Sequence, residues 1–104
     1  MAVRTGDEYL NGLLNTGREI WLGGERVDCV VDHPQLRGGA RAIADYYDLH
    51  HTAPNDLVIS DPDNGEPMSI SHMMPTTSDD LKQRHTGLAQ MAELSMGVMG
   101  RTPD

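Results

Sequence analysis

Apolar residues near the start of the chain follow the spacing of an amphipathic helix. Thr5, followed three residues later by Glu8, makes a capping box, which commonly marks the start of a helix. The apolar residues after it recur three and four positions apart, at Tyr9, Leu10, Leu13 and Leu14. The pattern predicts a helix over residues 6–15, ended by Gly17.

Two further stretches carry the pattern of β-hairpins. In the first, residues 18–22 and 25–27 flank Gly23 and Gly24, a pair suited to a two-residue turn. In the second, Leu57–Ile59 and Met68–Ile70 are apolar islands in a segment rich in Pro, Asn, Asp, Ser and Thr. Between them, residues 61–65 read Asp-Pro-Asp-Asn-Gly, which favours a turn.

Two longer helices are expected elsewhere. After Asp32-His-Pro, a helix over residues 35–50 would present one apolar stripe of Leu36, Ala40, Ile43, Ala44 and Tyr47. Ser78, followed by two acidic residues, is typical of a helix N-cap and predicts a third helix that ends near Gly97 or Gly100. The residues that continue this helix pattern are Leu81, Leu88, Met91, Ala92, Ser95, Val98 and Met99. The fold is predicted to be mainly α with two short β-hairpins, in one domain of residues 1–104.

Charge and composition exclude several classes of function. Sixteen acidic against eight basic residues give a formal charge of −8, which disfavours binding to nucleic acid or to anionic lipid. No stretch approaches the roughly 18 consecutive apolar residues of a membrane helix, and the acidic first residues are unlike a secretory signal. Cys29 is the single cysteine, so no internal disulfide is possible. A cytoplasmic protein without nucleic-acid or membrane partners is expected.

Residues with metal-binding or nucleophilic potential do not form motifs. The histidines contain no i, i+4 pair that would place two ring nitrogens on one metal, so surface or capping roles and no metal are expected for His33, His50, His51, His72 and His85. Cys29 lies among valines without a base nearby in sequence, which indicates a buried, inert thiol. Met91, Met96 and Met99 are expected to pack in a core or to face a partner.

Arg101 stands out among the polar residues. It follows the last predicted helix and Gly100, in a loop that Pro103 keeps from continuing the helix. From its spacing alone, the leading interpretation is that the guanidinium caps helical carbonyls. Contact with a substrate is the alternative.

Four segments resemble, in order and interval, the N-terminal part of the 4-hydroxyphenylacetate 3-hydroxylase family. They are Thr-Gly-Asp-Glu-Tyr-Leu at residues 5–10, Gly-Arg-Glu-Ile-Trp-Leu-Gly-Gly-Glu-Arg-Val at 17–27, Asp-His-Pro-Gln-Leu-Arg-Gly-Gly-Ala-Arg at 32–41, and Met-Gly-Arg-Thr-Pro-Asp at 99–104. The last segment is the most diagnostic. With shorter matches between them, the resemblance covers nearly the whole chain.

The resemblance implies the N-terminal helical domain of an acyl-CoA-dehydrogenase-like flavoprotein, without the family's middle β-domain and C-terminal helical bundle. In such enzymes FADH2 is supplied by a separate NAD(P)H:flavin reductase and reacts with O2 to give a flavin hydroperoxide. This species hydroxylates a phenol ortho to its hydroxyl group. The FAD-binding segments and a later histidine lie beyond residue 104, so the segment alone is expected to be inactive. The full-length protein is expected to be a homo-oligomer.

The resemblance also implies the site residues. It makes Arg101 a catalytic and substrate-binding residue and Asp104 a substrate-binding residue. A fixed cation beside a phenol favours the phenolate, whose ring is the stronger nucleophile. One departure concerns residues 86–92, where relatives often carry bulky aromatic residues, and it leaves open which phenol is the substrate.

Two alternatives remain. The flavin-containing 4-hydroxybutyryl-CoA dehydratases form another branch of the superfamily and resemble this chain in the Asp-His-Pro region, although the ending at residues 99–104 is hydroxylase-like. The second alternative is a non-catalytic helical interaction module. It is motivated by a short, Met-rich core that is poorly suited to stand alone.

Overall fold

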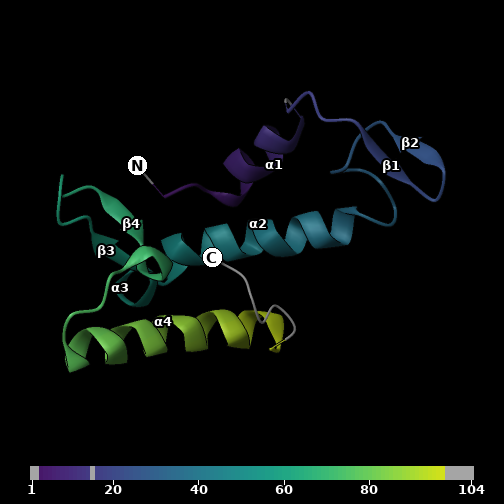
Figure 1. Ribbon diagram of the computed structural model, residues 1–104. Helices are drawn as coiled ribbons and strands as arrows, with labels where there is room; N and C mark the ends of the chain where they lie inside the picture. Colours follow the sequence, from purple (N-terminus) through teal and green to yellow (C-terminus); the bar gives the residue numbers. More distant parts are fainter. Residues whose placement is uncertain (1–2, 15, 98–104) are drawn as a thin grey trace. The chain divides into compact units, whose positions relative to one another are not determined.

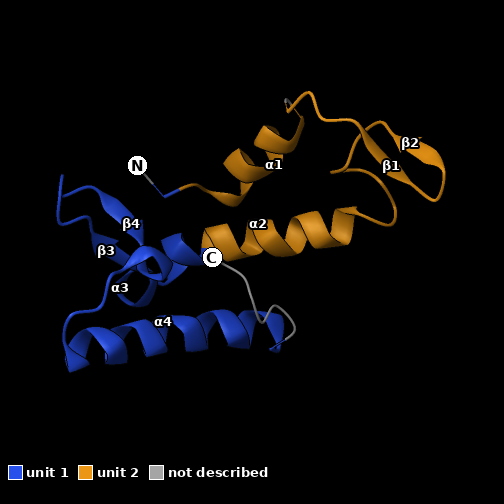
Figure 2. Ribbon diagram, viewed as in Figure 1, with its two compact units in different colours: residues 1–3, 49–104 blue, residues 4–48 orange. Residues whose placement is uncertain are grey.

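The computed structural model describes residues 3–14 and 16–97. The predicted helices and both predicted hairpins are present, in the order shown in Figure 1. The prediction of a mainly α fold with two short β-hairpins is therefore confirmed. The chain divides into two compact units, residues 4–48 and residues 1–3 with 49–104 (Figure 2).

The unit of residues 4–48 contains α1 (Gly6–Leu14), the strands β1 (Ile20–Leu22) and β2 (Glu25–Val27), and most of α2 (Arg37–Thr52). The start of α1 is capped as predicted, because the backbone N–H of Glu8 donates to Oγ1 of Thr5 at 3.2 Å. The helix is described as far as Leu14, and the predicted boundary at residue 15 lies outside the described residues.

The first turn of α1 lies against α2. The backbone N–H of Gly6 donates to Oδ1 of Asp48 at 2.6 Å, and a Cβ on Gly6 would lie 2.6 Å from the carbonyl oxygen of Ala44. Farther along α1, the Tyr9 ring stacks on Tyr47 with a centroid distance of 5.0 Å. Burial, and secondarily the neighbouring Tyr47, raises the pKa of Tyr9, so its hydroxyl stays protonated at neutral pH.

The first hairpin has the turn that its two glycines predict. Ile20 lies opposite Val27 and Leu22 opposite Glu25 in an antiparallel register. Gly23 and Gly24 have φ angles of 62° and 82°. A two-residue turn with both central residues at positive φ matches the twist of the flanking strands, and glycine adopts it without steric cost.

Helix α2 begins at Arg37, two residues later than predicted. The delay arises from a turn in which the N–H of Arg37 donates to the carbonyl of His33 at 2.8 Å. Ala40 and Ala44 are buried, as the stripe predicted, and Tyr46 is buried as well. The buried face of α2 is thus wider than the predicted stripe.

The unit of residues 1–3 and 49–104 contains the end of α2, α3 (Pro54–Leu57), β3 (Val58–Ser60), β4 (Pro67–Ser69), the 3-10 helix η1 (Ile70–His72) and α4 (Ser78–Ser95). Its core is formed by Leu57, Ile70 and Met91. The short helices α3 and η1 were not predicted. Pro54 starts α3, where its missing N–H has no consequence, and Ser69 caps η1 by accepting from the N–H of Ser71.

The second hairpin is closed by the predicted turn. The N–H of Gly65 donates to the carbonyl of Asp61 at 2.7 Å, and the N–H of Asp63 donates to Oδ1 of Asp61 at 2.8 Å. Gly65 takes a φ of 76°. Asp61 therefore shapes the turn through its own side chain.

Candidate functional site

The predicted site residues, Arg101 and Asp104, lie outside the described residues. Along the chain they follow α4, so the way in which α4 is fixed determines where residues 98–104 begin. The main contacts of α4 are made with α3 and η1, within the same compact unit.

The N-cap of α4 lies one residue earlier than predicted. Thr77, not Ser78, occupies the N-cap, with extended backbone angles of −130° and 165°. Its Oγ1 accepts from the N–H of Asp80 at 3.1 Å, and the Asp80 carboxylate accepts from the N–H of Thr77 at 3.3 Å. The prediction of Ser78 is wrong because Thr77 with Asp80 completes a reciprocal capping box, which stabilises the helix start more than a single serine.

The capping box makes the stability of α4 depend on pH. Hydrogen bonds to its carboxylate, above all from the N–H of Thr76, lower the pKa of Asp80. Because the folded-state pKa is depressed, the stabilisation is present above the unfolded-state pKa of about 3.9 and is lost as pH falls through the folded-state pKa. We expect Asp80→Asn to unfold at lower urea than the natural chain at pH 7, and this difference to shrink below about pH 4.

Urea titrations followed by circular dichroism at several pH values test this expectation. Asp79→Asn is the matched control, since the Asp79 carboxylate accepts no hydrogen bond from the described residues. A difference between the natural chain and Asp80→Asn that stays constant down to pH 2 would contradict it.

A glycine fixes the middle of α4 against the rest of its unit. A Cβ on Gly87 would lie 2.7 Å from Cγ2 of Ile70 and 2.8 Å from the carbonyl oxygen of Asp56. One turn later, Nε2 of Gln90 donates to Oδ2 of Asp56 at 3.1 Å. The helix is therefore held at close range to both α3 and η1.

The C-terminal end of α4 is closed by backbone groups. Met96 takes a left-handed φ of 54° and Gly97 a φ of 77°. The N–H of Gly97 donates to the carbonyl of Ala92 at 2.8 Å, and the N–H of Met96 donates to that of Glu93 at 3.4 Å. This is the pattern of a Schellman motif. It confirms the predicted helix end near Gly97.

The apolar residues that continue α4 are only partly buried. Met91 is buried, but Leu81 and Leu88 are 57% and 38% exposed. Met96, expected in a core or facing a partner, is 91% exposed. Val98 and Met99 lie outside the described residues. The buried face is instead centred on Gly87 and Met91, because only a glycine permits the close approach to Ile70 and Asp56.

His50 differs from the surface role predicted for it. Its exposure is 2%, and its Nε2 lies 2.8 Å from Oγ of Ser69, which in turn lies 2.9 Å from Oγ of Ser71. This chain of hydrogen bonds joins the end of α2 to β4 and η1. The missed signal was spacing, since position 50 follows Tyr47 by three residues and continues the apolar stripe of α2. The Nδ1 of His33 accepts from the N–H of Gln35 at 3.1 Å in the turn before α2.

Cys29 is half-buried, not fully buried as predicted. Its Sγ donates to Oδ2 of Asp32 at 3.6 Å. The thiol lines a pocket of about 190 Å³ between the end of α1, the first hairpin and the segment that follows it. Both Arg18 and Arg26 also line this pocket.

The pocket beside Cys29 is smaller than the roughly 300–1,000 Å³ of typical ligand sites. Within residues 3–14 and 16–97, no group of three or more His, Cys, Asp and Glu side chains is arranged to hold a metal ion. None of the helices in this part of the chain is long and apolar enough to span a membrane.

Comparison with known proteins gives consistent matches. Residues 5–104 match the family model described as 4-hydroxyphenylacetate 3-hydroxylase N terminal. The chain is 34% identical, over its entire length, to the oxygenase component of 4-hydroxyphenylacetate 3-monooxygenase from Geobacillus sp. strain PA-9. The match covers 21% of that relative, so the chain spans about a fifth of the length of the curated relatives it matches.

Solved structures show the same likeness. The oxygenase component of 4-hydroxyphenylacetate 3-monooxygenase, crystallised with FAD and 4-hydroxyphenylacetate, superposes with a TM-score of 0.87 at 34% identity, covering 96% of this chain and 21% of that one. An archaeal 4-hydroxybutyryl-CoA dehydratase from N. maritimus superposes with a TM-score of 0.76 at 24% identity, covering 88% and 18%. The second likeness shows a common fold alone.

Proposed function

The chain belongs to the 4-hydroxyphenylacetate 3-hydroxylase N-terminal family, and from this premise we propose that the complete protein is the oxygenase component of a two-component, FADH2-dependent phenol monooxygenase. The observation that carries the proposal is the match over residues 5–104, together with a relative of the same fold that was crystallised with both FAD and a phenolic acid. The reaction class is ortho-hydroxylation of a phenol with O2.

The whole protein would have the architecture of its relatives. Residues 1–104 would be the N-terminal domain of an acyl-CoA-dehydrogenase-like fold, followed by a β-domain and a helical bundle that forms a homo-oligomer. Those later domains would bind FAD, as the family resemblance implies for the segments beyond residue 104. A separate NAD(P)H:flavin reductase would supply FADH2. The single cysteine and the need for reduced flavin favour the cytoplasm.

Arg101 would orient the phenol and favour its ionisation, and Asp104, three residues later, would also bind the substrate. Two features support a role for Arg101 beyond helix capping. The carbonyls of Ala92 and Glu93 at the end of α4 already accept from backbone N–H groups at residues 96 and 97. A guanidinium also remains charged when it is shielded from water, so it can lower the pKa of a phenol permanently.

The test is hydroxylation by the complete protein. Purified protein supplied with reduced FAD, 4-hydroxyphenylacetate and ¹⁸O2 is expected to place one labelled oxygen on the ring carbon next to the phenol hydroxyl. The 104-residue chain, assayed in the same way, is expected to be inactive. Dehydration of 4-hydroxybutyryl-CoA without ring hydroxylation would favour the dehydratase branch.

A non-catalytic interaction module is the second candidate, and the exposed leucines of α4 are the observation that favours it. Failure of the complete protein to bind reduced flavin, with the 104-residue chain forming a stable folded monomer, would support the module. Tight flavin binding by the complete protein would exclude it.

A further inference from the structure

The outer face of α4 carries an exposed apolar stripe. Leu81, His85, Leu88 and Ala92 follow one another at intervals of four, three and four residues, and all are exposed. This is the spacing at which one helix packs along another. The stripe lies on a different side of the helix from the buried residues Gly87 and Met91, so α3 and η1 do not use it.

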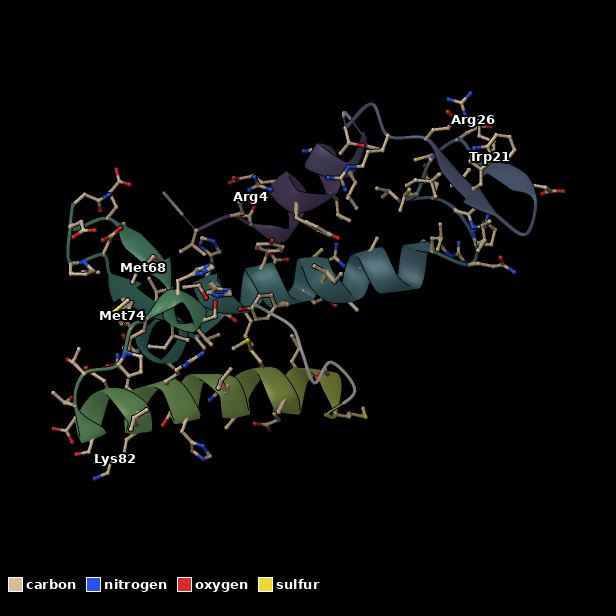
Figure 3. All side chains as sticks on the ribbon, in the orientation of Figure 1. Arg4, Trp21, Arg26, Met68, Met74 and Lys82 are labelled. Atoms are coloured by element: carbon tan, nitrogen blue, oxygen red, sulfur yellow. The ribbon has the colours of Figure 1, made fainter. Side chains whose placement is uncertain are left out.

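The charged residues beside the stripe are basic, whereas the chain as a whole is acidic. Residues 81–92 include Lys82 and Arg84 and no acid, although the whole chain has a net charge of −8. Lys82 points away from the rest of its unit (Figure 3). The Nε of Arg84 is buried and has no hydrogen-bond partner among the described residues. A partner that supplies carboxylates next to an apolar surface would complement both cations.

We propose that the stripe of Leu81, His85, Leu88 and Ala92 is the docking surface for an amphipathic helix with acidic flanking residues. This helix belongs to the part of the family fold that follows the matched segment. The relatives are about five times as long as this match, which covers 21% of the Geobacillus oxygenase component. In a protein of that length, a long helix with two exposed leucines at i, i+7 is expected to be covered by another part of the protein and not left exposed to solvent. The proposal rests on family membership and not on the hydroxylation chemistry.

The first experiment uses the 104-residue chain itself. The double variant Leu81→Glu/Leu88→Glu is expected to keep the urea midpoint and the monomeric sedimentation behaviour of the natural chain, because neither side chain is part of its core. A natural chain that sediments as a dimer, with the double variant as a monomer, would assign the stripe to a second copy and overturn the proposal. A large drop in the midpoint would make the stripe a part of the core and would also overturn it.

The second experiment places the chain in a full-length protein. A chimera carries these 104 residues in place of the matched fifth of the Geobacillus oxygenase component. Amide hydrogen exchange over residues 81–92 is expected to be at least about tenfold slower in the chimera than in the chain alone. The double variant should return exchange in the chimera to the rate of the chain alone, and Lys82→Glu should remove part of the protection.

Gln83→Glu/Thr86→Glu is the matched control, since both residues are exposed on the side of α4 away from the stripe. This control should keep the protection. Equal exchange in the chimera and the isolated chain, or equal losses in the control and the double variant, would overturn the docking surface. If Lys82→Glu leaves the protection of residues 81–92 unchanged, the proposal that the docked helix carries acidic flanking residues is overturned. Each readout is independent of turnover, so failure here is distinguishable from failure of the hydroxylase proposal.

Discussion

Replacing Gly87 by alanine is expected to destabilise the chain by about 2 kcal/mol. The added methyl would meet the carbonyl oxygen of Asp56 at 2.8 Å and Cγ2 of Ile70 at 2.7 Å, both too close for carbon. Overpacking of this kind costs about 1–3 kcal/mol, and a backbone carbonyl cannot rotate away as a side chain can. Because the clash with the carbonyl places the packing cost near 3 kcal/mol and alanine recovers up to about 1 kcal/mol of helix propensity, a net loss of about 2 kcal/mol remains.

Urea unfolding of the 104-residue chain, followed by circular dichroism, measures the loss. Gly12→Ala is the matched control, because Gly12 is also helical and a Cβ there would have no neighbour within 4 Å. This control is expected to gain about 0.5–1 kcal/mol from helix propensity alone. Equal shifts of the two variants would mean that α4 does not approach α3 and η1 as closely as the structure describes.

The sequence was sufficient wherever local chemistry determines the backbone. Gly23 and Gly24 predict a two-residue turn because few other residues adopt two consecutive positive φ angles. Thr5 with Glu8 predicts the start of α1 for a similar reason, since the cap satisfies backbone donors within one turn of helix. Such signals need no knowledge of the rest of the fold.

The inward face of α4 could not be predicted in the same way. Leu81 and Leu88 are the more apolar positions, yet the helix packs through Gly87, whose value lies in the absence of a side chain. Hydrophobicity identifies the stripe that a partner could cover, and it does not say which stripe the chain itself covers. His50 is a comparable case, because its burial depends on Ser69, which lies 19 residues away.

The candidate site depended on resemblance more than on physics. Spacing alone favours Arg101 as a helix cap. Only the resemblance of residues 99–104 to the family motif predicts that Arg101 binds the substrate. The ordered end of α4 at Met96 and Gly97 makes capping by Arg101 less necessary. The role of Arg101 is therefore best tested by an experiment in which a cap and a substrate cation give different results.

In the complete protein, Arg101→Ala is expected to lower kcat/KM for a phenolic substrate by about 10²–10³ at pH 7, as the loss of a preorganised electrostatic contact does in other enzymes. Flavin binding, measured by fluorescence titration, should be unchanged. Arg37→Ala is the control for loss of an arginine, because Arg37 is exposed at the start of α2. This control should keep normal turnover.

The pH dependence of Arg101→Ala separates the two roles. A cation lowers the pKa of the bound phenol, so the natural protein binds it as phenolate at neutral pH. In the variant, the phenol ionises only as pH approaches its ordinary pKa of about 10. The deficit in kcat/KM should therefore shrink as pH rises from 7 toward 10. Arg101→Lys should lie between the two at pH 7, since lysine keeps a charge but not the fixed planar fork. A helix cap predicts a small deficit that is the same at every pH, and that result would remove Arg101 from the substrate site.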